Sequence, residues 1–146
     1  MLTRDPLPRL RLYLAALLAF GMLGALTELL LLHHYEDSWQ FVPLVLIGTA
    51  LVVLVWHLFD RSALSVRVLQ TMMALFLVAG LLGVVLHYQA NIEFQVETSP
   101  GLSGWPLFVK AIQAKVPPAL APGLMAQLGL LGLLYGYKHP SLRSES

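Results

Sequence analysis

Four runs of apolar residues divide the chain, and shorter polar connections separate them. The runs cover residues 12–32, 41–59, 68–87 and 119–137. Each is close to the about 20 residues that an α-helix needs to cross a hydrocarbon core about 30 Å thick. The pattern therefore predicts an all-α integral membrane protein, in which a four-transmembrane-helix bundle forms a single membrane domain over residues 1–146.

Two of the runs have an alternative interpretation. Residues 12–32 follow a basic segment that Pro6 and Pro8 should keep out of a helix, and this arrangement resembles a secretory signal. The run exceeds the about 7–15 apolar residues of a signal, and no small-residue cleavage site follows it, so we expect a retained first transmembrane helix. Residues 41–59 are rich in Val and Ile, which also suits a buried strand. Their length and the three similar runs favour a helix in lipid.

Composition supports the membrane class. The sequence is 58% hydrophobic and only 12% charged, whereas about 25% of the residues of a soluble domain are charged. The first expected partner is therefore the lipid bilayer. A net charge of +1 without a basic cluster gives no indication of a nucleic-acid partner. The sequence contains no cysteine, which excludes disulfides, thiolate metal sites and cysteine nucleophiles.

The placement of lysine and arginine predicts the orientation of the spans, because cytoplasmic loops are enriched in these residues. The connection 33–40 has none, and the long connection 88–118 has only two, Lys110 and Lys115. The shorter basic segments lie before the first span, between the second and third spans, and after the fourth: Arg4, Arg9 and Arg11; Arg61 and Arg67; Lys138 and Arg143. We therefore predict a multi-pass protein with both termini in the cytoplasm.

The long connection 88–118 contains a further expected element. After turn-forming residues at 99–101, apolar residues recur at helical spacing, and they are Trp105, Phe108, Val109, Ile112 and Val116. This pattern predicts a short extracytoplasmic interfacial helix over about residues 105–116, with Trp105 as its anchor. The alternative is that this helix caps the bundle. Small residues in the spans, among them Gly132 and Gly136, indicate close helix packing, either within the bundle or against a partner helix.

Two stretches rich in potential ligands meet at the predicted outer face. The first is His33-His34-Tyr35-Glu36-Asp37 and the second runs from His87 to Glu97, while Glu28 lies inside the first apolar run. Imidazoles with carboxylates are suitable ligands for zinc, manganese or iron. We therefore predict one outward-facing polar site that holds a divalent metal ion, formed by Glu28, His33, His34, Glu36, His87, Asn91 and Glu93. The spacing matches no established metal motif, and the alternative is that these residues are solvated helix ends.

The functional prediction is a small non-enzymatic component, or accessory subunit, of a membrane assembly. No Ser-His-Asp arrangement, phosphate-binding glycine loop or pair of catalytic carboxylates is recognisable in the sequence. The protein is expected to associate with copies of itself or with other membrane subunits. One alternative is a membrane redox or metal-dependent enzyme, in which the outer site holds the metal or His33 or His34 pairs with His87 on a surface haem. The other alternative is a proton- or ion-conducting oligomer that uses Glu28.

Overall fold

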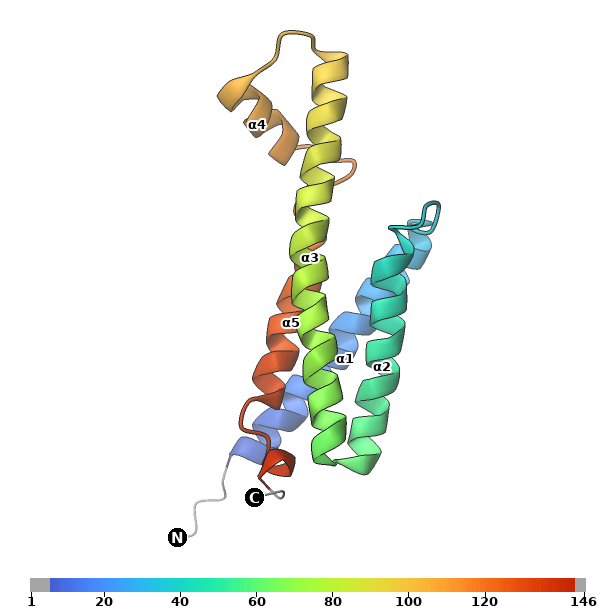
Figure 1. Cartoon of the computed structure of the whole chain (residues 1–146), viewed down its shortest axis with the longest axis vertical. Helices are drawn as coiled ribbons and strands as arrows, with labels where there is room; N and C mark the ends of the chain where they lie inside the picture. Colours follow the sequence, from blue (N-terminus) through green and yellow to red (C-terminus); the bar gives the residue numbers. More distant parts are fainter. Residues whose placement is uncertain (1–5, 144–146) are drawn as a thin grey trace.

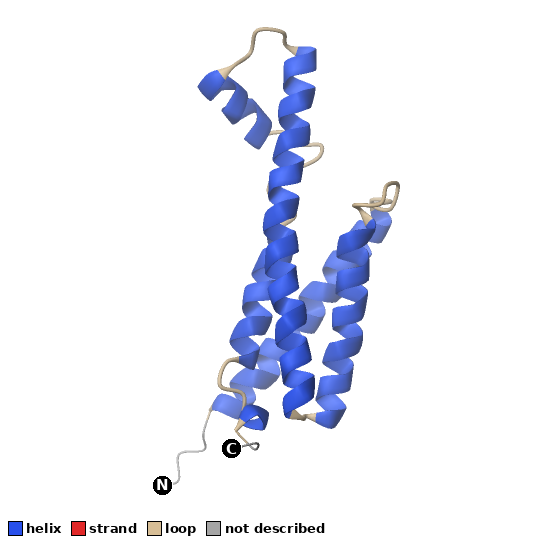
Figure 2. Ribbon diagram, viewed as in Figure 1, coloured by secondary structure: helices blue, strands red, loops and turns tan. Residues whose placement is uncertain are grey.

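The computed structural model describes residues 6–143 and is all-α over this range (Figures 1 and 2). Five α-helices follow one another, and a short 3-10 turn closes the described chain. The elements are α1 (Leu7–Leu31), α2 (Phe41–Asp60), α3 (Ala63–Thr98), α4 (Gly104–Ile112), α5 (Gly123–Gly136) and η1 (Pro140–Leu142). Of these, α1, α2 and α3 are long and apolar enough to cross a membrane, which indicates an integral membrane protein.

The last predicted span is shorter than the sequence suggested. α5 has 14 residues and begins at Gly123, whereas the prediction began at residue 119. Proline explains the difference. The α conformation is unfavourable for the residue before a proline, and Pro122 has no N–H to donate to the carbonyl oxygen of residue 118. Residues 119–122 therefore form turns.

Two other helix boundaries differ from expectation. α1 begins at Leu7, so the prediction that Pro6 and Pro8 keep this segment out of a helix is wrong. Both prolines lie at the start of the helix, where a missing N–H costs little. α4 covers Gly104–Ile112 and ends four residues before the predicted boundary at residue 116.

The third helix is much longer than its apolar run. α3 has 36 residues, which corresponds to a length of about 54 Å. Ser62 caps its start by accepting a hydrogen bond from the backbone N–H of Ser65 at 3.1 Å. The polar stretch after His87 continues the helix to Thr98. α3 projects well past the α1–α2 connection, and α4 folds back beside its end (Figure 1).

The tightest packing joins α3 and α5, which run antiparallel. A Cβ atom on Gly129 would lie 2.6 Å from the carbonyl oxygen of Met73 and 2.7 Å from the amide nitrogen of Leu77, so the two backbones touch at this point. α2 packs on α3, whereas α1 packs on α5 and α2. The buried core lies where these four helices come together, and its fully buried members include Leu18, Met22, Ile47, Leu54, Leu69, Met73 and Phe76.

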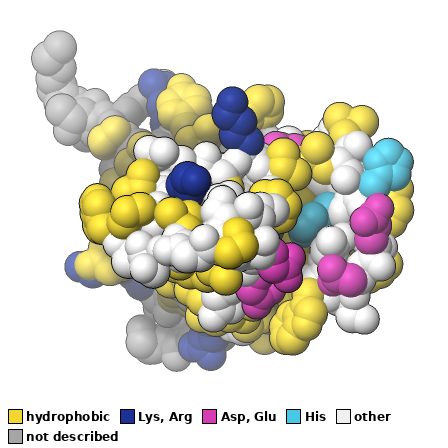
Figure 3. Space-filling view, turned by 90° about the horizontal axis from the view of Figure 1, so that it is seen from above, with side chains coloured by type: hydrophobic (Ala, Val, Ile, Leu, Met, Phe, Trp, Pro, Cys, Tyr) yellow, Lys and Arg dark blue, Asp and Glu magenta, His cyan; other side chains and the backbone are white. Residues whose placement is uncertain are grey.

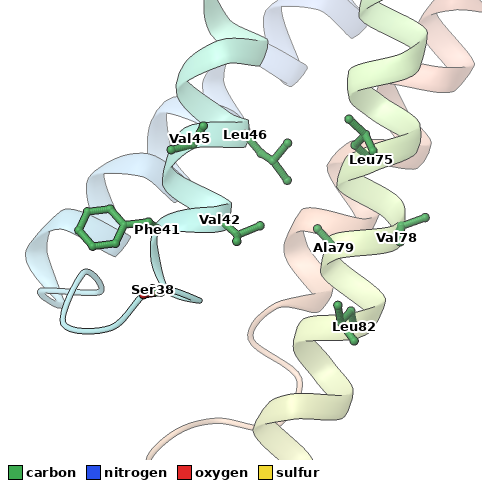
Figure 4. Close-up of a pocket in the computed structure, with 9 residues that line it drawn as sticks. All are labelled: Ser38, Phe41, Val42, Val45, Leu46, Leu75, Val78, Ala79 and Leu82. Carbon is green, nitrogen blue, oxygen red and sulfur yellow. The ribbon is translucent and has the colours of Figure 1, made fainter.

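The α2–α3 pair separates toward the end that carries the α1–α2 connection. An open groove of about 500 Å³ lies between the two helices there. Its walls are almost entirely apolar, with Val42 and Leu46 on α2 facing Leu75, Ala79 and Leu82 on α3 (Figure 4). The groove lies within the apolar part of both helices.

Candidate functional site

Two of the predicted outer ligands meet in the structure. The rings of His34 and His87 lie 6.4 Å apart between centroids, which brings the connection after α1 next to α3. His34 is half-buried. Desolvation by burial, followed by the neighbouring His87, lowers the pKa of His34 below its usual value, while Asp37 opposes the shift. The His34 imidazole is therefore neutral at pH 7, as a metal ligand must be.

A hydrogen bond fixes the tautomer of His87. Its Nδ1 lies 3.0 Å from the carbonyl oxygen of Pro118. A carbonyl oxygen can only accept, so Nδ1 carries the proton and donates it to this bond. In the neutral ring, Nε2 then holds a lone pair for another donor or for a metal ion. His87 thus links α3 to the segment that leads into α5, and its Nε2 can still accept a hydrogen bond or bind a metal ion.

Asn91 has a structural role at this end of the molecule. Its side chain is buried, and its Nδ2 donates to the carbonyl oxygens of Ala111 at 3.2 Å and Pro117 at 3.0 Å. These two bonds hold the end of α4 and the following turn against α3. The Nδ2 of Asn91 is therefore engaged in holding α4 and not in the His34–His87 pair.

The remaining predicted ligands do not join that pair. Glu28, His33, Glu36 and Glu93 are all exposed, and His33 lies against the ring of Tyr35 instead. Among residues 6–143, no group of three or more histidine and acidic side chains is close enough to hold a metal ion. Figure 3 shows this end from above, with histidine and acidic side chains mostly on one side of it. The structure thus brings together two of the seven residues, and metal binding stays a prediction.

Replacing Asn91 by alanine should loosen α4. The change leaves two carbonyl oxygens without their donor, a loss of about 1–3 kcal/mol for a buried polar contact. The local opening of residues 104–118 should then increase on the order of tenfold. Trypsin cleavage after Lys110 and Lys115 reports this opening, and Gln89→Ala at an exposed position of α3 is the control. Equal cleavage rates in both variants would contradict the anchoring role.

A second polar centre lies at the opposite end of the bundle, around His57. The imidazole is 1% exposed. Its Nδ1 lies 2.8 Å from Ser65 Oγ and its Nε2 lies 2.8 Å from the hydroxyl oxygen of Tyr135. Ser65 Oγ also donates to the carbonyl oxygen of Ser62 at 2.9 Å, which uses its only proton. His57 Nδ1 therefore donates to Ser65, and in the neutral ring Nε2 accepts from Tyr135.

His139 extends this centre beyond the end of α5. Its ring centroid lies 5.1 Å from that of His57 and 5.4 Å from that of Tyr135, and its Nδ1 accepts from the backbone N–H of Ser141 at 3.3 Å. Desolvation by burial lowers the pKa of His139 to about 4, and His57, Arg11 and Arg61 add to the effect. His139 is therefore neutral at physiological pH. The three aromatic rings form a compact neutral cluster, which we call the His57 cluster, together with Ser65.

The depressed pKa of His139 predicts a loss of stability in acid. A histidine of ordinary pKa, about 6.5, takes up a proton in the unfolded chain before it does so in the folded one. Its contribution is therefore complete above pH 6.5 and is lost as the pH falls toward 4. Thermal unfolding in detergent over this range should show a decline that is weaker in His139→Asn, since asparagine keeps an acceptor for Ser141. An identical decline in both proteins would contradict the assignment.

The His57 cluster was not predicted from the sequence. A signal was present, because a histidine inside an apolar run has to find hydrogen-bond partners when it is buried. The predicted topology also brought Ser65, Tyr135 and His139 to the same end as His57. The sequence could not show which of these side chains reach the imidazole, because that depends on how α5 packs against α2 and α3.

No protein-family model, curated protein or solved structure matches this chain.

Proposed function

We propose that the chain crosses the membrane four times, as a single domain over residues 1–146. Two contacts between α3 and the last part of the chain support the fourth crossing. Pro118 accepts from His87 at 3.0 Å, and Gly136 accepts from the side-chain amide of Gln70 at 3.2 Å. Between these contacts α3 rises about 26 Å, close to the thickness of a hydrocarbon core. The turn at 119–122 and α5 together cover this depth, although α5 alone does not.

The proposed orientation has both termini in the cytoplasm, and the distribution of lysine and arginine supports it. Arg4, one of the basic residues in this count, lies outside the described residues. A reporter fused after Ser146 tests the proposal directly. A cytoplasmic signal is expected, and an extracytoplasmic signal would reverse the orientation.

We propose that the protein is a non-enzymatic subunit of a membrane assembly and that the α3–α4 projection binds other subunits. The observation that carries this proposal is the length of α3. Residues 88–98 continue the helix about 16 Å beyond His87, and Asn91 fixes α4 beside them. In this region Phe94 is 58% exposed and Trp105 is 73% exposed. Apolar side chains that project past the hydrocarbon core favour a protein partner over solvent.

Mass measurement in mild detergent tests the subunit proposal. The wild-type chain is expected in a species larger than its own monomer, formed with other subunits or with further copies of itself. Phe94→Gln should reduce this species by removing an apolar contact, whereas Glu97→Gln on the same exposed stretch should leave it in place. A wild-type monomer without a partner, or an unchanged assembly in Phe94→Gln, would count against the proposal.

We also propose that the His34–His87 pair is the core of the outward-facing polar site and that this site binds a divalent metal ion. The neutral His34 and the Nε2 of His87 favour this second function. Zinc and manganese binding to the purified protein, compared with the double variant His34→Ala, His87→Ala, provides the test. Equal binding by both proteins would rule out the site, and absence of binding would leave these groups with a structural role.

A further inference from the structure

A cavity lined by both polar and apolar side chains lies beside the His57 cluster, at the end of the bundle opposite α4. Its volume is about 280 Å³. α1, the end of α2, the end of α5 and the turn η1 all contribute to its wall. The polar side chains of this wall belong to Arg11, His57, Arg61, Tyr135, His139 and Ser141.

Backbone contacts hold both arginines of this cavity in the wall. Arg11 Nη2 donates to the carbonyl oxygen of Lys138 at 3.2 Å, which ties the start of α1 to the end of α5. Arg61 Nε donates to the carbonyl oxygen of Leu58 at 3.4 Å, and the backbone carbonyl of Arg61 accepts from Ser141 Oγ at 2.5 Å. Each guanidinium has several N–H donors, so one such bond leaves most of them for a further acceptor.

The cavity carries a net positive charge. Tyr135 bonds to His57, and His139 is neutral at pH 7 because its pKa lies at about 4. The neighbouring acid, Asp60, accepts a hydrogen bond from Ser62 and brings one negative charge against the two positive charges of Arg11 and Arg61. Arg11 and Arg61 both help to lower the pKa of His139, which places the two positive charges near the same imidazole. Two guanidinium groups beside one small cavity suit a tetrahedral anion with several acceptor oxygens.

The apolar part of the wall indicates where such an anion comes from. Leu12 and Leu58 line the cavity and are exposed beside it. On α1 the exposed apolar surface continues from Leu12 through Leu17 to Phe20, toward the middle of the helix. A headgroup in the cavity would therefore leave its acyl chains beside this apolar surface.

We propose that this cavity binds a phosphate group through Arg11 and Arg61. The headgroup of an anionic phospholipid and a soluble phosphate share this chemistry, and the continuous apolar surface favours the lipid. The inference concerns the end of the bundle away from the α3–α4 projection. It does not depend on the proposed subunit function or on which terminus faces the cytoplasm.

Native mass spectrometry of the full chain in detergent tests the proposal, with phosphatidylglycerol and phosphatidylcholine as probes. The wild type should retain one phosphatidylglycerol in preference to the zwitterionic phosphatidylcholine. The double variant Arg11→Gln, Arg61→Gln should bind phosphatidylglycerol about tenfold more weakly, because it loses both charged donors. The matched control is Lys110→Gln, Lys115→Gln, which removes the same charge at the other end and should bind like the wild type. Inorganic phosphate at millimolar concentration is then added in a thermal-shift measurement.

The results of the two measurements distinguish a phospholipid headgroup from a soluble phosphate as the bound group. Retention of phosphatidylglycerol without a thermal shift by phosphate supports the lipid headgroup, whereas an arginine-dependent shift by phosphate supports a soluble ligand. Equal lipid retention by the arginine variant and the wild type would overturn the proposal, as would the absence of both responses in the wild type. If the double variant does not fold, Arg61→Gln alone replaces it, since that side chain is exposed and should weaken binding without loss of the fold.

Discussion

Replacing Gly129 by valine is expected to destroy the packed arrangement of α3 and α5. The new Cβ would lie 2.6 Å from the carbonyl oxygen of Met73 and 2.7 Å from the amide nitrogen of Leu77. These are backbone atoms of a helix, so they cannot rotate away as a side chain would. Overpacking in a core costs about 1–3 kcal/mol even when side chains can adjust. A clash between two backbones should cost more, out of a total stability of about 5–15 kcal/mol.

Thermal unfolding and size-exclusion chromatography in detergent measure this effect. Gly129→Val should unfold at a much lower temperature or fail to elute as one species. The matched control is Gly48→Val on α2, where a Cβ would meet nothing within 4 Å. Its stability should change by no more than about 1 kcal/mol, the range set by helix propensity. Similar behaviour of the two variants would mean that α5 does not pack on α3 in this register.

Removal of one hydroxyl from the His57 cluster is expected to have the second large effect. Tyr135→Phe takes away the donor at His57 Nε2, 2.8 Å away, and keeps the shape of the ring. The imidazole is buried, and a buried ring nitrogen normally keeps a hydrogen-bond partner. A buried acceptor without a partner costs about 1–3 kcal/mol. The same change at Tyr137, which is 62% exposed, should cost little.

Thermal unfolding of the two tyrosine variants under identical conditions decides this point. The expected order is a clear loss for Tyr135→Phe and a value near that of the wild type for Tyr137→Phe. A second variant, Ser65→Ala, removes the acceptor for His57 Nδ1 and should resemble Tyr135→Phe. If neither Tyr135→Phe nor Ser65→Ala lowers stability, the hydrogen bonds of the His57 cluster do not contribute to the fold.

The boundaries of the helices show which structural features can be predicted from local sequence patterns. The start of α2 at Phe41 agrees with the prediction, and the serine that caps α3 is a typical helix-start residue. The end of α3 was not predictable from the apolar pattern alone, because residues 88–98 are polar enough to suit a loop. The short α5 was predictable in principle, since Pro122 sits inside the apolar run.

The polar contacts depended on information that no local pattern contains. The outer site required α1 and α3 to meet along their outer ends, but α1 packs on α5 and α2 instead. Glu28 therefore remains exposed, and only His34 in the following connection reaches His87. Asn91 belongs to the predicted site because it lies in the ligand-rich stretch that begins at His87. In the structure, its side chain binds the backbone carbonyls of Ala111 and Pro117, which lie 20 and 26 positions later in the chain.

The sequence by itself determined that this protein is helical and belongs in a membrane. That outcome is local, because in lipid each span has to satisfy its own backbone hydrogen bonds, and a run of about 20 apolar residues does so as a helix. Only the tertiary structure decided which polar groups meet. His57 and Tyr135 are 78 residues apart, and glycines at Gly80 and Gly129 let α5 approach α3 closely enough to bring the hydroxyl to the imidazole. Partners of this kind follow from the register between packed helices, which a one-dimensional pattern does not contain.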